Sequence, residues 1–156
     1  MTREDGARLV REWQAAGEEV VFTNGCFDLI HAGHVRYLAA ARALGDRLVV
    51  GLNSDRSVGA LKGPDRPILP EEDRAELLAA LRAVDAVVIF DEPTASDTLL
   101  ALRPNVYAKG GDWRPETLPE APAASAVGAR ITLLPFHEGR STTQLIERIK
   151  AGSPDK

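Results

Sequence analysis

The 156-residue sequence has a single cysteine, no long apolar run and no excess of basic residues. One cysteine excludes an internal disulfide and any metal site built from several cysteines. Because no apolar stretch approaches bilayer length and none follows Met1 as a signal peptide, we expect a cytoplasmic protein with no membrane partner. A net charge of −4 with both signs interspersed gives no basic surface, so we expect no nucleic-acid partner.

Length and hydrophobic patterning predict one α/β domain over residues 1–156. Residues 1–17 have helical spacing of apolar positions, with Thr2 as the expected cap. Residues 18–151 form the expected core, and 152–156 a short tail. No internal repeat or low-complexity tract divides the chain.

Strand and helix patterns alternate along the core. The expected strands are Glu19–Thr23, Arg47–Asn53, Val84–Phe90, Asn105–Lys109 and Arg130–Leu134. Helices are expected to begin near His31, Pro70, Thr94 and Ser141, whereas Ser54–Leu69, with its glycines and prolines, predicts a long functional loop. This alternation predicts a Rossmann-like, doubly wound sheet of five parallel strands, which binds ligands beyond the carboxyl ends of the strands.

The most informative segment runs from Thr23 to His34, with the sequence TNGCFDLIHAGH. It follows an apolar run and leads into a helix, so His31 and His34 lie on one face of the first helical turn. A helix N-terminus binds phosphate through its free N–H groups, and histidines there add charge. The segment alone predicts an anion site, although a solvated histidine pair without function has the same spacing.

Other polar segments follow the second and fourth predicted strands and precede the last predicted helix. They are Asn53-Ser54-Asp55, Lys109 to Trp113, and Gly139 to Thr143, with Lys62 as a further positive charge. Their glycines, hydroxyls and lysines suit a polyphosphate. Neither a Walker-type string nor Gly-x-Gly-x-x-Gly occurs, so the histidine segment would take the place of both.

Thr23 to His34 resembles the His-x-Gly-His signature of the nucleotidyltransferase superfamily, and Ser141-Thr142-Thr143 resembles its C-terminal signature. Within that superfamily the chain resembles the heptose-phosphate adenylyltransferases from about Glu18 to the last helix. The strings that carry this resemblance are Thr23 to Asp28, Asn53-Ser54-Asp55, Leu61-Lys62-Gly63-Pro64, Arg66-Pro67 and Lys109-Gly110-Gly111-Asp112.

The resemblance implies transfer of AMP from ATP to D-glycero-D-manno-heptose 1-phosphate, giving ADP-heptose and pyrophosphate for a glycan such as lipopolysaccharide. It also implies Mg²⁺ held mainly through phosphates, with no metal ligand among the side chains. A homodimer is expected on the same ground, and the sugar kinase of the pathway is expected to be a separate protein.

The same resemblance assigns roles to individual residues. His31, His34 and Lys62 are the expected catalytic residues, which stabilise charge on the triphosphate and the leaving pyrophosphate. The expected nucleotide-binding residues are Thr23, Asn24, Gly25, Phe27, Asp28, Gly33, Asn53, Asp55, Arg74, Lys109, Gly110, Gly111, Asp112, Ser141, Thr142 and Thr143. Asp28 is expected to order the helix start, and Arg74 has an alternative role as the partner of Glu71 one turn earlier.

Three alternatives stay open: a cytidylyltransferase for a polyol phosphate such as glycerol 3-phosphate, a flavin-mononucleotide adenylyltransferase, and a nucleotide-binding module without activity. Phe136 stands where related cytidylyltransferases carry arginine. Pro119 and Pro122 predict little helix after Trp113. The sequence does not decide between ATP, GTP and CTP.

Overall fold

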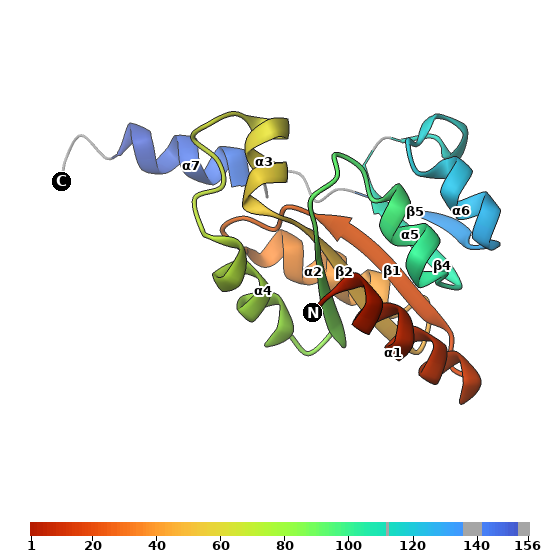
Figure 1. The fold of residues 1–156 in the computed structure, drawn as a ribbon. Coiled ribbons are helices and arrows are strands. Elements are labelled where there is room, and N and C mark those ends of the chain that lie inside the picture. Colours follow the sequence, from red (N-terminus) through yellow and green to blue (C-terminus); the bar gives the residue numbers. More distant parts are fainter. Residues whose placement is uncertain (112, 136–141, 153–156) are drawn as a thin grey trace.

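The computed structural model describes residues 1–111, 113–135 and 142–152 (Figure 1). Its sheet has the strand order β3-β2-β1-β4-β5, and every pairing is parallel. The strands are β1 (Val20–Gly25), β2 (Arg47–Asn53), β3 (Ala86–Phe90), β4 (Val106–Gly110) and β5 (Arg130–Leu134). The predicted doubly wound sheet of five strands is confirmed, and the strand order reverses between β1 and β4.

The helices are α1 (Arg3–Ala15), α2 (Ala32–Arg42), α3 (Asp55–Lys62), α4 (Glu71–Ala79), α5 (Ser96–Leu102), α6 (Ala121–Val127) and α7 (Thr142–Ala151), with a 3₁₀ turn over Pro115–Thr117. Thr2 caps α1 as predicted, because its hydroxyl accepts the Asp5 N–H at 3.1 Å. Figure 1 shows α7 extending away from the sheet, past α3. In the part of the chain that the structure describes, no helix is both long and apolar enough to span a bilayer.

The prediction of a long loop over Ser54–Leu69 is wrong, because α3 occupies its first half. Ser54 caps that helix by accepting the Ser57 N–H at 3.2 Å, and the side chain of Val58, within the helix, is fully buried. Gly63 ends α3 with a φ of 103°, a conformation that favours glycine. The remaining loop is therefore short and anchored at both ends.

The expectation of little helix after Trp113 is also wrong. Pro122 lies in the first turn of α6, where a backbone N–H has no partner within the helix to lose. Gly128 ends α6 with a φ of 73°. Proline here helps to start a helix instead of interrupting one.

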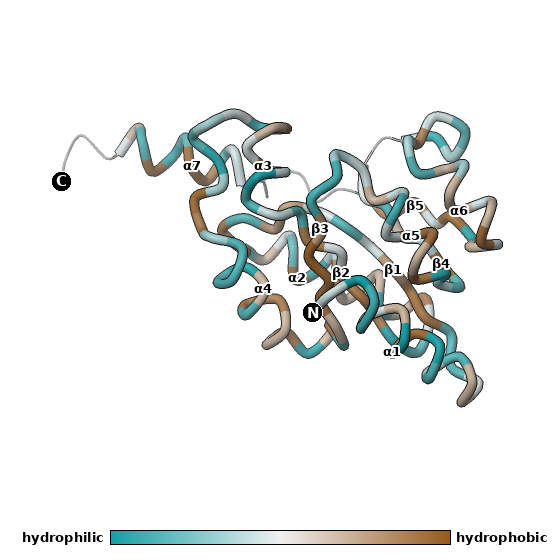
Figure 2. The backbone as a smooth tube through the Cα atoms, viewed as in Figure 1, coloured by the Kyte–Doolittle hydropathy of each residue, from teal (hydrophilic) through white to brown (hydrophobic). Residues whose placement is uncertain are grey.

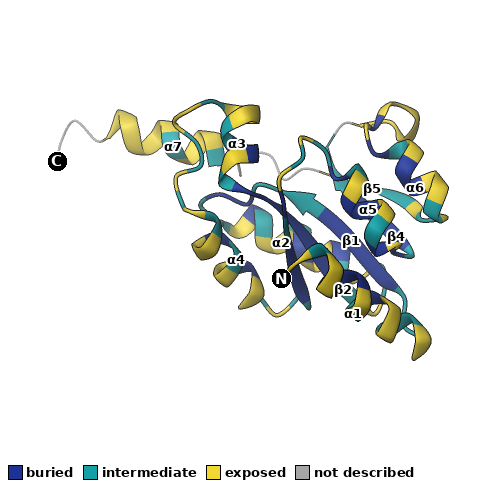
Figure 3. Ribbon diagram, in the orientation of Figure 1, coloured by how far each residue is buried: buried dark blue, intermediate teal, exposed yellow. Residues whose placement is uncertain are grey.

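Alternate residues of the strands pack against two separate layers of helices. Val20 and Phe22 pack with α1, α5 and α6, whereas Val21 packs with α2 and α4 on the opposite face. Figure 2 shows hydrophobic residues concentrated along the strands, and Figure 3 shows the strands buried beneath helices whose outer faces are exposed. Loops from both layers converge at the carboxyl edge of the sheet.

Gly51 marks a close contact within this core. A Cβ added there would lie 2.6 Å from Phe22 Cζ and 3.3 Å from Phe90 Cε1, and both rings are buried. We expect Gly51→Ala to lower the free energy of unfolding in urea by about 1–3 kcal/mol, because the rings must shift. Gly59→Ala in α3 is the matched control, since its new Cβ would meet only Arg66 O at 3.5 Å. That variant should gain about 0.5–1 kcal/mol; equal effects at the two sites would contradict this packing.

Candidate active site

A cavity of about 660 Å³ lies at the carboxyl ends of β1, β2 and β4, at the reversal of strand order. The predicted site residues that line it are Asn24, Gly25, Phe27, Asp28, His34, Asn53, Lys62, Lys109, Gly110 and Thr142. Two predicted residues, Asp112 and Ser141, lie outside the described residues. The structure therefore brings most of the described predictions to one place, the position where doubly wound folds bind ligands.

The two histidines form a reciprocal cap at the start of α2. The Nδ1 atom of His31 accepts the Gly33 N–H at 3.1 Å, and the Nδ1 atom of His34 accepts the His31 N–H at 3.2 Å. Their ring centroids are 4.0 Å apart, and the Phe27 ring lies 5.5 Å from His34. Because Nδ1 of His34 accepts a hydrogen bond, the neutral tautomer of this ring carries its proton on Nε2, so the histidine that lines the cavity presents an N–H donor to a ligand.

His34 is neutral in the free protein. Burial, together with the smaller effects of the positive charges of His31 and Lys62, lowers its pKa to about 4. The sequence-based expectation that this histidine adds charge therefore does not describe the free state. Its N–H is a dipole already in position, next to the free N–H groups of the helix start.

The Asp28 side chain holds a loop and does not cap α2, which corrects the role expected for it. Its buried carboxylate accepts the Ile68 N–H at 2.7 Å and the Leu69 N–H at 3.0 Å, and it pairs with Arg66 at 3.4 Å. Its backbone carbonyl accepts the Thr142 hydroxyl at 2.7 Å, which joins the start of α7 to the site. Asp28 thus fixes the segment that follows Lys62.

Arg74, predicted to contact the nucleotide, has no exposed surface and does not line the cavity. Its guanidinium donates to three backbone carbonyls, those of Cys26 at 2.7 Å, Asn53 at 2.9 Å and Leu69 at 2.9 Å. The fourth partner is the Asp55 carboxylate, at 2.7 Å. Arg74 therefore joins the ends of β1 and β2 to the loop before α4, from behind the cavity.

Thr23 and Asp55 are likewise used inside the protein and do not line the cavity. The fully buried Thr23 hydroxyl donates to Ala108 O at 2.8 Å and lies 2.6 Å from the Tyr37 hydroxyl, so it ties β1 to β4 and α2. Asp55 pairs with the buried arginine, and its N–H donates to Glu71 at 3.0 Å, so the alternative pairing of Glu71 with that arginine does not form. The lining also does not include Gly33, Gly111, Thr143 or His31.

Several lining residues were not predicted as site residues. They include Cys26, Tyr37, Leu61, Arg66, Thr94, Trp113 and Glu120. Arg66 could have been found, because it belongs to a string that carries the family resemblance. Trp113 lies at the mouth with the Lys109 ammonium 5.9 Å from its ring centroid. Nothing in the sequence pointed to Glu120, which is brought in by a helix that was not expected.

A family model described as cytidylyltransferase-like matches residues 22–148 of the chain. That range holds the histidine cap, the cavity and all five strand ends. The chain belongs to the cytidylyltransferase-like nucleotidyltransferase family.

Relatives of this nucleotidyltransferase domain include the bifunctional protein HldE of Methylobacillus flagellatus, 53% identical over 90% of this chain and 29% of that protein. HldE of Gluconacetobacter diazotrophicus is 49% identical over 100% of the chain and 32% of its own length. The chain therefore spans about a third of these relatives. The solved lipopolysaccharide core biosynthesis protein from Thermoplasma volcanium GSS1 matches with a TM-score of 0.64 and 27% identity, over 80% of this chain and 100% of that one.

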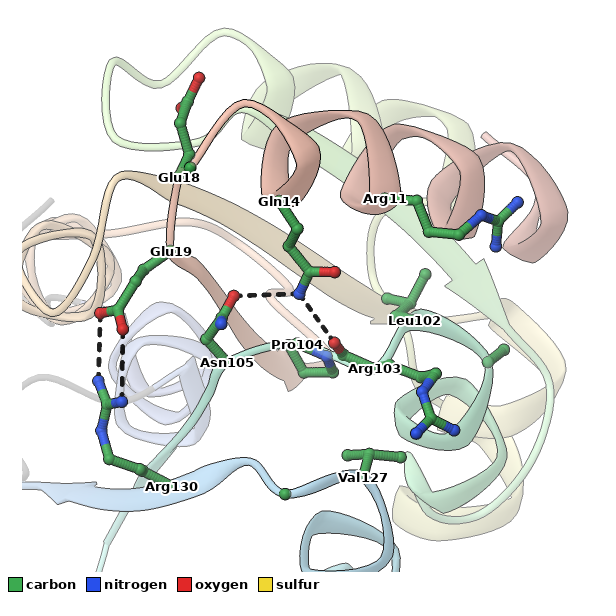
Figure 4. Close-up of a pocket in the computed structure, with 13 residues that line it drawn as sticks. Arg11, Gln14, Glu18, Glu19, Leu102, Arg103, Pro104, Asn105, Val127 and Arg130 are labelled. Atoms are coloured by element: carbon green, nitrogen blue, oxygen red, sulfur yellow. Dashed lines mark hydrogen bonds and ion pairs between the residues drawn. The ribbon is translucent and has the colours of Figure 1, made fainter.

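A second hollow, of about 570 Å³, lies at the opposite edge of the sheet of this nucleotidyltransferase domain (Figure 4). Its side chains are largely engaged with one another. Gln14 donates to Asn105 Oδ1 and to Arg103 O at 3.0 Å each, and Glu19 pairs with Arg130. No predicted site residue lines this hollow. It lies at the amino ends of the strands, whereas ligands of doubly wound folds bind at the carboxyl ends.

The depressed pKa of His34 predicts an acid dependence of stability. Between its ordinary pKa of 6.5 and about 4 in the fold, the unfolded chain binds more protons at this residue, so the free energy of unfolding falls as pH is lowered through that range. His34→Gln keeps an acceptor for the His31 N–H but cannot titrate. In urea unfolding at pH 7 and pH 4.5, the variant should lose less stability on acidification than the wild type. Parallel losses would refute the assigned pKa.

Proposed function

We propose that this domain transfers AMP from ATP to D-glycero-D-manno-heptose 1-phosphate, giving ADP-heptose and pyrophosphate. The observation that carries the proposal is the histidine cap at the start of α2, whose His34 lines, together with Lys62, the cavity where strand order reverses. The name of the Thermoplasma relative, a lipopolysaccharide core biosynthesis protein, supports a sugar acceptor. The identity of about half of the residues to HldE proteins supports the same choice.

The chemistry requires no nucleophile from the protein. An oxygen of the sugar phosphate attacks the α-phosphorus of ATP, the new P–O bond forms, and the bond to the oxygen of the leaving pyrophosphate breaks. Both reactants are anions, so the domain must align them and stabilise growing negative charge. His34 and the N–H groups at the start of α2 would bind the departing phosphates, with Lys62 closing over them from the end of α3. Lys109 and Thr142 would contact the rest of the nucleotide.

We propose Mg²⁺ as the metal, bound mainly by phosphate oxygens. The nearby carboxylate of Asp28 is already occupied by two N–H groups and Arg66, so it suits an indirect role. Over residues 1–111, 113–135 and 142–152, no group of three or more His, Cys, Asp or Glu side chains could hold a metal ion. When bound, the ion would neutralise charge on the triphosphate.

We also propose a homodimer. An apolar hollow of about 370 Å³ lies between α2 and the segment after α4. Val35 of α2 and Leu77 of α4, both about 45% exposed, add apolar surface that a second copy of the chain could cover. The sugar kinase as a separate protein and a cytoplasmic location stay predictions.

Cytidylyl transfer to a polyol phosphate is the second candidate, because the matching family model is cytidylyltransferase-like. The two candidates share the histidine cap and differ in the base and the acceptor. The loop Lys109-Gly110-Gly111-Asp112 favours the heptose enzyme by resemblance.

A pyrophosphate-release screen tests the proposal. ATP, CTP and GTP are each combined with heptose 1-phosphate, glycerol 3-phosphate and flavin mononucleotide, in Mg²⁺ buffer. We expect release only with ATP and heptose 1-phosphate together. Release with CTP and glycerol 3-phosphate instead would establish the second candidate, and nucleotide binding without any release would indicate a module without activity.

Two variants serve as controls for the screen. His34→Ala should reduce release by about 100-fold or more, because one positioned donor to the leaving phosphates is lost. Arg36→Gln, on the exposed side of α2 and away from the cavity, should leave release unchanged.

A further inference from the structure

The side chain of Glu120 is buried at the cavity with half of its carboxylate unused. Glu120 precedes α6, lines the cavity and is only 3% exposed. Its Oε2 atom accepts the Ala95 N–H at 3.2 Å, but its Oε1 atom has no partner among the described residues. A buried carboxylate oxygen without a donor is costly, and it calls for a ligand or water to complete it.

The neighbouring hydroxyl does not complete it. Tyr107 donates its single proton to Asn24 Oδ1. Burial raises the pKa of Tyr107, and the charge of Glu120 and a weak side-chain interaction with it raise that pKa further, so the hydroxyl lies close to the carboxylate although its short hydrogen bond goes to Asn24. The Glu120 carboxylate is therefore an acceptor that still needs a donor.

Glu120 and His34 stand on opposite walls of the cavity. His34 belongs to α2, in the helix layer that packs on Val21, whereas α6 belongs to the layer that packs on Val20 and Phe22. The wall around Glu120 also contains Pro93 and Thr94, from the loop after β3. This wall holds an anionic group, while the opposite side carries the histidine cap and Lys62.

The geometry of the reaction indicates which wall faces the leaving group and which faces the acceptor. This step rests on the proposed function. In displacement at phosphorus, the attacking and leaving oxygens lie roughly in line on opposite sides of the phosphorus. If the pyrophosphate leaves toward His34, the acceptor enters from the side of Glu120. Its phosphate then lies at the reaction centre, and its carbon chain extends toward the carboxylate.

We propose that Glu120 binds hydroxyl groups of the acceptor and selects hydroxyl-rich sugar or polyol phosphates. A carboxylate oxygen accepts hydrogen bonds and donates none, so it favours hydroxyl donors and repels phosphate. A site built to hydrogen-bond a hydroxyl discriminates strongly against analogues that lack it, since the buried partner is then left unsatisfied. Glu120 is in this account a specificity-determining residue that takes no part in bond breaking.

Glu120→Gln tests the proposal in the full chain. The amide oxygen can still accept the Ala95 N–H, while the amide NH₂ replaces the unused acceptor with a donor. With ATP and heptose 1-phosphate we expect the KM for the acceptor to rise roughly tenfold or more, with the KM for ATP and the melting temperature little changed. Glu116→Gln is the matched control, because Glu116 is exposed in the 3₁₀ turn and does not line the cavity. It should leave both KM values unchanged.

The outcomes separate this proposal from the proposed function. If the wild type transfers AMP but Glu120→Gln changes neither KM, or raises only the KM for ATP, the role of Glu120 is refuted and the function stands. If the wild type uses glycerol 3-phosphate instead of heptose 1-phosphate, the proposed acceptor is refuted, and the same comparison is made with glycerol 3-phosphate.

A second measurement does not require the variant to fold. The wild type is assayed with a series of acceptors that each lack one hydroxyl. At least one deoxy acceptor should have a KM roughly tenfold or more above that of its parent, because the buried carboxylate is then left without its donor. Equal KM values across the series for the wild type would overturn the proposal.

Discussion

The buried guanidinium of Arg74 is the interaction on which the site depends. Parallel strands deliver their loops to one edge of the sheet, but nothing in the sheet itself fixes how those loops lie relative to one another. Arg74 donates to the carbonyls of Cys26, Asn53 and Leu69, one from each of three segments that meet there. Because its charge is matched by Asp55, the arginine can stay fully buried. The segments next to the histidine cap and next to Lys62 are thereby bound to the same buried side chain.

Asp28 complements this arrangement from the cavity side. Its carboxylate binds Ile68 and Leu69 through their N–H groups, while Arg74 binds the carbonyl of Leu69. The backbone N–H and the carbonyl of Leu69 are therefore both hydrogen-bonded to side chains. These bonds fix the position of the loop after Lys62, although the loop has no regular secondary structure. Preorganisation of this kind matters for a reaction that depends on alignment and on stabilisation of charge.

The charge of His34 responds to an anionic ligand in the cavity. Burial and the charges of His31 and Lys62 keep His34 neutral, so positive charge is limited while the site is empty of phosphate. A bound triphosphate would reverse this balance, because negative charge favours the protonated imidazole. The histidine can then gain a proton where charge develops during transfer.

Much of the fold could be predicted from sequence. The buried strands and the helix after the histidine segment have clear periodicity, and the alternation of strands and helices predicts the doubly wound sheet. Sequence fails to predict α3 and α6, because glycine and proline in these segments favour loops over helices. Ser54 and the burial of Val58 stabilise α3, while Pro122 occupies a first turn that tolerates it.

The site was predicted where it depends on local motifs and missed where it depends on tertiary packing. The spacing of His31 and His34 is a property of one helical turn, so the sequence was sufficient to predict that they lie side by side. Resemblance identified Arg74 as a residue of the site, but whether its side chain faces a ligand or three carbonyls depends on loops distant in sequence. Glu120 could not be predicted for the same reason, since an unexpected helix places it in the cavity.

The most direct measurement is a crystal structure of the chain with Mg²⁺ and a non-hydrolysable ATP analogue. The account predicts the β- and γ-phosphates within hydrogen-bond distance of His34 and the first N–H groups of α2, with Arg74 retaining its four partners. A triphosphate bound by Arg74, or bound in the hollow between Arg11 and Arg103 at the opposite edge of the sheet, would contradict it.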